Sequence, residues 1–446
     1  MDNRLSFTDQ ALFLGLRATG QELAMQSVWI YDHPVDFDGL RRFHKNFGHG
    51  FMGRLIEPSP LPFGRHRWVA SQGPASALDI ESRARPRTEV ADWADERAQL
   101  PIDPEWGPGW HLGVLPLADG GTAISLVGSH CLTDGGGAAL TVLEAVSGHT
   151  RDFGYPPPGA RTRMRAVSAD LWDTVKGVPE VVRTLVEVAR QARRRRRDIS
   201  RSAQPLRAPV SGDDLDRTFV APAITAFVDV DAWDARANAL GGTSHALVAG
   251  FAAKLAERMG RVRADDGLVT LNVPINDRTL EDTRANAVTL GDITVDPTNL
   301  TTDLSVLRSS IRRSLKSRNE LSDENVKLLP LIPFLPKRIV RRTADVMFNF
   351  ADLPVSCSNM GELPASIRRV DGTEAETVYM RGIDRAVTKR FLERRRGLLT
   401  VISARIGSRL MLTVVGYRPG ADNTKLEMCE LVGKTLAEFD LDGEIA

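Results

Sequence analysis

His130 and Asp134 are separated by three residues and lie between an apolar segment and a run of three glycines. The preceding residues, 122–128, are β-branched and apolar and predict a buried strand, whereas the apolar spacing of 138–146 predicts a helix. A histidine that leaves a strand suits a general base, because its ordinary pKa lies near working pH and the strand holds the ring. We therefore predict a strand–turn–helix unit that carries a base; the alternative is a histidine that only packs in a turn.

The residues around His130 favour a neutral histidine and argue against two other kinds of site. Asp134 precedes the predicted helix, where free N–H groups and the helix dipole favour a carboxylate and disfavour an imidazolium, so we expect His130 to be neutral. Cys131 adjoins His130, but side chains alternate along a strand, which argues against a cysteine nucleophile. Gly135, Gly136 and Gly137 allow a close backbone approach, yet their spacing is not that of a phosphate-binding loop.

The motif His130-Cys-Leu-Thr-Asp134-Gly135 resembles the His-x-x-x-Asp-Gly motif of the chloramphenicol acetyltransferase-like superfamily. That superfamily includes plant acyl-CoA acyltransferases, nonribosomal peptide condensation domains and bacterial wax ester synthase/diacylglycerol acyltransferases. The flanking segments are most similar to the last group. They are residues 5–13, 100–116, 270–278, 285–288 and 358–361.

The resemblance implies an α/β fold with mixed sheets, in which two chloramphenicol acetyltransferase-like subdomains enclose an active-site tunnel. It implies His130 as the general base, with Gly135 beside it and Asp134 as structural support. Related acyltransferases pair the motif aspartate with an arginine, which here is Arg278; Arg284 is the alternative partner. An unpaired buried carboxylate would be costly, so a partner for Asp134 is expected on physical grounds as well.

Further candidate residues are expected to bind the substrates or the oxyanion. We predict that the Gly135 backbone or side chains of the strand and turn at 355–361 donate hydrogen bonds to the oxyanion, and that Trp110 contacts substrate. The substrate-binding candidates are Ser356, Ser358, Asn359 and Trp110.

The function that the resemblance implies is acyl transfer from a thioester, most simply acyl-CoA as co-substrate, to an alcohol acceptor, as in wax ester synthases. One alternative is a condensation-type enzyme that takes its acyl group from an acyl carrier protein and forms an ester or amide. A second alternative is a non-catalytic binding relative. Ser129 stands where wax synthases have a first histidine, and Ser244-His245 where they have Asn-Asp, which leaves the acceptor open.

The composition agrees with a folded chain of two subdomains. The 446 residues are 42% hydrophobic and 26% charged, with a formal net charge of +1, so no global field predicts a nucleic-acid partner. Three cysteines form neither a disulfide framework nor a zinc motif, and we expect no metal and no cofactor. The absence of a signal-like start or a long apolar run predicts a cytoplasmic protein.

The predicted divisions are an N-terminal half at 1–160, a helical crossover at 161–217 and a C-terminal half at 218–446. In the first half, we predict a helix at 6–16 capped by Ser6 or Thr8, a helix at 37–47 with one apolar face, and a hairpin of 112–117 and 122–128 across the turn at Asp119. The crossover contains a long helix, broken or kinked at Pro179, that ends in an arginine run, 193–197. The run is a solvated helix end or a contact with phosphate or anionic lipid. Residues 328–336 contain three prolines, which argue against a regular helix, and are followed by basic residues. They form either a packed connector or a wall for an acyl chain or a peripheral membrane contact.

Overall fold

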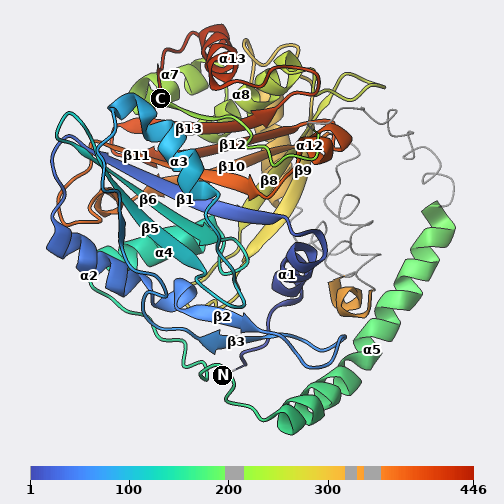
Figure 1. The fold of residues 1–446 in the computed structure, drawn as a ribbon. Coiled ribbons are helices and arrows are strands. Elements are labelled where there is room, and N and C mark those ends of the chain that lie inside the picture. The colour runs from blue at the N-terminus through green and yellow to red at the C-terminus, as the bar shows by residue number, and fades with distance from the viewer. Residues whose placement is uncertain (1, 196–214, 317–328, 336–352) are drawn as a thin grey trace.

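The computed structural model of the chain describes residues 2–195, 215–316, 329–335 and 353–446. Two mixed sheets dominate it, each with helices against it, and a short hairpin of β2 (Arg54–Glu57) and β3 (Arg67–Ala70) lies below the first sheet (Figure 1). This arrangement is the two-subdomain α/β architecture expected from the sequence.

The first sheet contains the strand that leads to His130. Its order is β11-β1-β6-β5-β4, and the strands span Glu22–Tyr31 (β1), Asp79–Ile80 (β4), Trp110–Pro116 (β5), Thr122–Ser129 (β6) and Thr377–Arg385 (β11). The predicted hairpin is confirmed, because β5 and β6 pair antiparallel across the turn at Asp119. All eight residues of β6 are buried, as expected for a central strand with helices on both faces.

Different helices cover the two faces of the first sheet. Helix α3 (Val90–Ala98) lies on one face, where Gln26 Nε2 of β1 donates to the Ala94 carbonyl at 2.8 Å. Helices α2 (Phe37–Phe47) and α4 (Gly135–Val146) pack against each other on the opposite face of the sheet. The core on that side includes Trp29, Phe43 and Phe47. The predicted helix at 37–47 is therefore confirmed with its apolar stripe inward.

The second sheet contains the strand with the predicted substrate-binding serines. Its order is β14-β7-β13-β12-β10-β8-β9, and the strands span Ala223–Asp229 (β7), Val269–Asn276 (β8), Val288–Val295 (β9), Val355–Leu363 (β10), Leu398–Ile406 (β12), Arg409–Tyr417 (β13) and Glu444–Ile445 (β14). One face packs against helices that span Val230–Ala239 (α7), Ser244–Arg258 (α8), Ser305–Lys316 (α9) and Lys425–Glu438 (α13). Phe251 of α8 is buried in the core they form.

The remaining elements connect and cover the sheets. Helix α1 (Phe7–Thr19) starts at Ser6, whose side chain accepts the Asp9 N–H as predicted for a cap. Helix α5 (Arg163–Arg195) runs along the outer edge (Figure 1) and continues through Pro179, so of the predicted break or kink the break is wrong. The shorter pieces are η1 (Gly50–Met52), η2 (Arg87–Glu89), η3 (Leu329–Phe334), η5 (Ala365–Arg368) and α12 (Lys389–Arg394).

The boundary between the two halves of the chain does not coincide with the boundary between the two sheets. Strand β11 comes late in the chain, within the predicted C-terminal half, yet it pairs antiparallel with β1 along the edge of the first sheet. No strand was predicted at these residues. This crossing strand ties the two halves together through backbone hydrogen bonds as well as side-chain packing.

The proline-rich segment 328–336 is described from residue 329 to 335. It forms η3, which packs against α1 and α5, and Phe334 stacks on Phe63 with ring centroids 6.2 Å apart. The prediction that prolines prevent a regular α-helix there is confirmed. Contact of this segment with an acyl chain or a membrane stays a prediction, and the arginine run at 193–197 lies partly outside the described residues.

Candidate active site

His130 follows the last residue of β6 and is fixed through its backbone. Its N–H donates to the Leu23 carbonyl of β1 at 3.0 Å, and its own carbonyl accepts from Asn286 Nδ2 at 3.3 Å. Helix α4 begins five residues later, at Gly135, with Asp134 as its N-cap. The turn that carries His130 is therefore held between a central strand and the first turn of a helix.

Asp134 uses both carboxylate oxygens. Oδ1 accepts the Gly137 N–H at 2.8 Å, which is the N-cap bond. Oδ2 accepts the Ala287 N–H at 2.8 Å and lies 2.8 Å from Arg278 Nη2. A buried carboxylate with so many donors is held in place rather than free to move a proton, which supports a structural role for Asp134.

Residues 285–287 of the second half form the bridge to this turn. Asp134 donates its own N–H to the Ala285 carbonyl at 2.8 Å, and Arg278 Nη2 donates to the same carbonyl at 2.7 Å. Asp9 of α1 accepts the N–H groups of Ala285 and Asn286 at 3.0 and 2.8 Å, and the Asn286 amide at 3.1 Å. Two carboxylates of the first half thus hold one short segment of the second.

Arg54 forms a second link between the motif and the second half, and it was not predicted from the sequence. Its guanidinium is buried and donates to the Leu132 carbonyl in the motif at 2.7 Å and to the Thr283 carbonyl at 2.6 Å. It lies 3.8 Å from the centroid of the Trp68 ring, a cation–π contact that compensates part of its lost hydration. Burial lowers the pKa of Arg54 from its ordinary value. Nothing in the sequence pattern around Arg54 indicates this contact.

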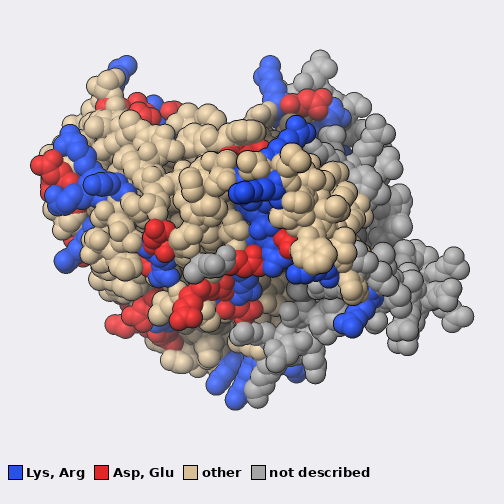
Figure 2. Space-filling model, turned by 90° about the horizontal axis from the view of Figure 1, so that it is seen from below, with Lys and Arg blue, Asp and Glu red and all other residues tan. Residues whose placement is uncertain are grey.

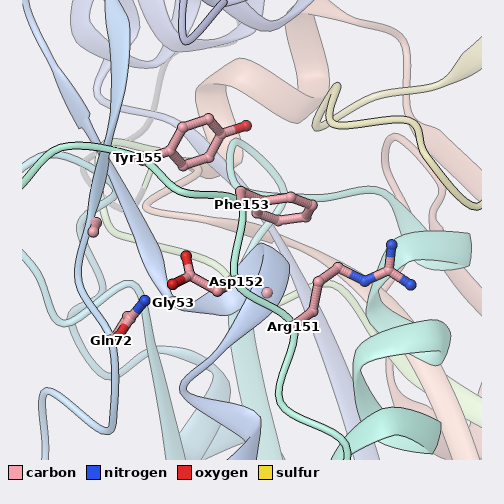
Figure 3. Close-up of a pocket in the computed structure, with 8 residues that line it drawn as sticks. Gly53, Gln72, Arg151, Asp152, Phe153 and Tyr155 are labelled. Atoms are coloured by element: carbon pink, nitrogen blue, oxygen red, sulfur yellow. The ribbon is translucent and has the colours of Figure 1, made fainter. Parts of the chain in front are cut away.

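A small hollow lies near Arg54, lined by residues of the turn before β2 and of the segment 151–155 (Figure 3). The Phe153 ring centroid is 5.6 Å from the Arg54 guanidinium, and the Tyr155 hydroxyl is buried without a hydrogen-bond partner among the described residues. Arg151 turns from this hollow toward α4, where it bonds Glu144. The hollow is a feature of the wall behind the motif and does not contain His130.

His130 is partly buried, and burial lowers the pKa of its imidazole; the charges of Asp134 and Asp9 and contact with Asn286 work in the opposite direction. The ring is therefore neutral at physiological pH, and desolvation is the largest cause of the lowered pKa. Nδ1 is enclosed and lacks a hydrogen-bond partner among the described residues. An enclosed Nδ1 cannot meet an incoming substrate, which leaves Nε2 as the nitrogen for proton transfer.

The predicted residues of β10 face the first half. Val355 and Cys357 lie in the core under the helices of the second half, so Ser356 and Ser358 point to the opposite side of the sheet. The strand neighbour of Ser358 is Ile402, which packs against the core of the first half. Ser358 and His130 are thus directed toward the same inter-sheet region, although no hydrogen bond joins them among the described residues.

The turn after Ser358 lies against the motif. A Cβ atom at Gly135 would stand 3.1 Å from Met360 Sδ and Cε, so the Met360 side chain occupies the space beside Gly135. Asn359 points elsewhere: its Nδ2 lies 3.3 Å from His245 Nδ1 at the start of α8, and its Oδ1 accepts the Gly361 N–H at 2.7 Å. The oxyanion and substrate roles of Ser356, Ser358, Asn359 and Gly135 stay predictions.

Trp110 and Cys131 are both packed in the core of the first half. Trp110 is 2% exposed, donates its indole N–H to the Met52 carbonyl at 3.2 Å and makes edge contacts with His44 and Phe47. These are the contacts of a packing residue, and substrate contact by Trp110 stays a prediction. Burial raises the pKa of the Cys131 thiol well above its ordinary value, which argues against a thiolate nucleophile.

The surface carries both signs of charge. Figure 2 shows Lys and Arg interspersed with Asp and Glu over the face seen from below. Over the described ranges, no three or more His, Cys, Asp or Glu side chains are grouped so that they could hold a metal ion. In the same part of the chain, no helix is both long and apolar enough to cross a bilayer.

The fold matches those of several solved structures. The chain is similar to the first condensation domain of the CDA synthetase, with 15% identity, a TM-score of 0.57 and 99% and 97% of the two chains covered. Polyketide synthase associated protein 5 from Mycobacterium tuberculosis gives 16% identity, a TM-score of 0.56 and coverage of 98% and 96%. The wax ester synthase/diacylglycerol acyltransferase from Marinobacter aquaeolei VT8 gives 14% identity, a TM-score of 0.55 and coverage of 98% of both chains.

No family model and no curated protein sequence matches the chain. The structural matches cover nearly the whole chain and most of each of these three relatives, so they define the architecture of both halves together. The chain has the chloramphenicol acetyltransferase-like fold that condensation domains share with wax ester synthases, as the sequence motif predicted.

Proposed function

We propose that this chain is an acyltransferase that moves an acyl group from a thioester to an alcohol acceptor, with His130 as the general base. The observation that carries the proposal is a neutral, partly buried histidine at a strand end, in a turn held by residues of both halves. The matched fold supports it, since its solved examples include a wax ester synthase and condensation domains.

The reaction follows from the position of His130. Nε2 takes the proton of the acceptor hydroxyl while that oxygen attacks the acyl carbonyl carbon. The tetrahedral intermediate then collapses, the carbon–sulfur bond breaks, and the imidazolium returns the proton to the departing thiolate. A positioned base contributes about 10²–10⁴ in rate, and holding both substrates in line contributes much of the rest.

We favour acyl-CoA as the acyl donor. The alternative is a condensation-type enzyme that accepts acyl groups from a carrier protein and forms an ester or amide. Its specific support is the condensation domain of the CDA synthetase, which matches the chain at a TM-score of 0.57, close to the 0.55 of the wax ester synthase. Both alternatives use the same base and differ only in the substrates.

An assay of the purified chain separates them. Acyl-CoA and acyl-carrier protein are each supplied with a long-chain alcohol, a diacylglycerol or a primary amine, and free thiol release and acylated product are both measured. Ester formed from acyl-CoA supports the favoured form, and product formed only from the carrier protein supports the alternative. The absence of product in every combination, with correctly folded protein, contradicts both.

A further inference from the structure

A carboxylate on the crossing strand β11 shares a sheet face with His130. In the register of the first sheet, Asp384 stands directly opposite Leu23, and Ala24 stands opposite Ser129. The His130 N–H bonds the Leu23 carbonyl at 3.0 Å, which continues the antiparallel pairing by one residue. His130, Leu23 and Asp384 therefore form a row across three neighbouring strands, with their side chains on one face.

That face points toward the second half. A Cβ atom at Gly382, two residues before Asp384 on the same face, would lie 3.8 Å from Ile402 Cδ1 and 3.9 Å from Leu23 Cδ1. Ile402 is the sheet neighbour of Ser358. The row thus opens into the same inter-sheet region as the predicted substrate side chains, and Leu23, between its two polar members, is 43% exposed.

The Asp384 carboxylate has no protein partner among the described residues. It is only partly exposed, and no described residue hydrogen-bonds its oxygens or lies within ion-pair distance of them. Burial raises the pKa of Asp384, and the charge of Arg395 works in the opposite direction. The adjacent Arg385, on the other face of the strand, is in contrast paired with Glu22. A partly desolvated carboxylate that no protein group binds can accept a hydrogen bond from a ligand.

We propose that Asp384 is a specificity-determining residue that binds a second hydrogen-bond donor of the acceptor, a hydroxyl or an ammonium group. The inference rests on the proposed function, because the acceptor's first donor is the group that His130 deprotonates. Neighbouring strands lie about 4.8 Å apart, so the Cα atoms of His130 and Asp384 are about 10 Å apart. A head group with two donors a few bonds apart spans the gap between the two side chains. The acceptor class is therefore a diol or an amino alcohol rather than a simple monoalcohol.

The test compares a long-chain vicinal diol, the corresponding amino alcohol and the monoalcohol of the same length. Asp384→Ala should raise KM for the diol and the amino alcohol about tenfold or more, because a hydrogen bond to a charged group is lost, and leave kcat and the monoalcohol KM unchanged. Asp384→Asn should keep much of the diol affinity and lose the amino alcohol, because an amide oxygen accepts but carries no charge. Asp442→Asn, at an exposed aspartate, is the matched control.

Calorimetric titration of the full chain with each acceptor, in the absence of an acyl donor, measures acceptor binding alone. It therefore tests the role of Asp384 separately from acyl transfer. Diol binding that weakens in Asp384→Ala but persists in His130→Ala supports the site even if no acyl transfer is detected. Equal effects of Asp384→Ala on diol and monoalcohol, or no effect on either, overturn the proposal while leaving acyl transfer in place. A wild-type chain that binds no diol overturns it as well. Circular dichroism and the melting temperature of each variant confirm that the comparison is made on folded protein.

Discussion

Arg278 Nη2 lies 2.8 Å from Asp134 Oδ2, and the two side chains are 5% and 4% exposed. The aspartate belongs to the first half and the arginine to the second, so this buried ion pair joins the two halves beside the motif. The Arg278 guanidinium also lies 4.6 Å from the centroid of the Phe51 ring and donates to the carbonyls of Arg284 and Ala285.

Removal of one partner should destabilise the protein strongly. Asp134→Ala and Arg278→Ala should each cost about 3–5 kcal/mol, because each leaves an uncompensated buried charge. The double variant should lose much less than the sum, since the second removal takes away the charge that the first left behind. Denaturant unfolding of the four proteins measures this coupling.

The control for that cycle is Asp282 and Arg284, an ion pair in the same loop whose arginine is largely solvated. Arg284→Ala should cost less than about 1 kcal/mol. Strictly additive losses for Asp134 and Arg278 would show that the pair does not act as a unit.

His130→Ala should fold normally and lose at least about two orders of magnitude in turnover, because the positioned base is gone. The readout is kcat with the donor and acceptor identified by the substrate assay. His149→Ala changes an exposed histidine and should leave turnover unchanged. An alanine variant at 130 with near-wild-type kcat would end the assignment of His130 as the base.

Asp9→Ala should lower both the melting temperature and turnover. It leaves the N–H groups of Ala285 and Asn286 and the Asn286 amide without their acceptor, at a cost of about 3 kcal/mol or more. Turnover should fall because the displaced segment also bonds Asp134 and the His130 carbonyl. Asp2→Ala, at an exposed aspartate near the same helix, should change neither measurement. Normal turnover in Asp9→Ala would separate this segment from the site.

Two neighbouring glycines of α4 should respond differently to alanine. A Cβ atom at Gly136 would meet Asn276 Nδ2 only at 3.5 Å, an ordinary contact, so Gly136→Ala should be neutral or stabilise by up to about 1 kcal/mol. At Gly137 the added atom would collide with the buried Thr133 hydroxyl and stand 3.2 Å from Arg278 Cζ. Gly137→Ala should therefore destabilise by about 1–3 kcal/mol. Equal melting temperatures for the two variants would contradict this difference.

Stability should fall as the pH drops below about 6.5, the ordinary histidine pKa. Burial lowers the pKa of His66 and of His111 to about 4, so between these values only the unfolded chain binds the protons. Each of these histidines then lowers the free energy of unfolding by up to about 3 kcal/mol by pH 4. His66→Asn keeps an acceptor for the Ser59 N–H and should flatten the pH dependence of the melting temperature, even if it is less stable at pH 7. An unchanged slope would contradict the shift of His66.

The sequence by itself determined the local elements around the site and their class. The apolar runs and the turn at Asp119 gave the β5–β6 hairpin, and the Ser6 and Asp134 caps gave the starts of α1 and α4. These features depend on hydrogen bonds and apolar spacing within a few residues, which a linear pattern displays directly. The motif from His130 to Gly135 predicted the fold through its resemblance, and the structural matches agree.

Only the tertiary structure decided which distant residues meet the motif. Asp9 looked like an acidic residue of a first helical turn, Arg54 like an ordinary arginine of a short strand, and β11 was not predicted, so Asp384 had no place beside His130. Asp9 meets Asn286 across 277 residues and Arg54 meets Thr283 across 229. Such contacts arise when the two halves close and buried polar groups must find partners, wherever those partners stand in the chain. The low pKa of His130 has the same origin, because desolvation depends on what the assembled halves exclude.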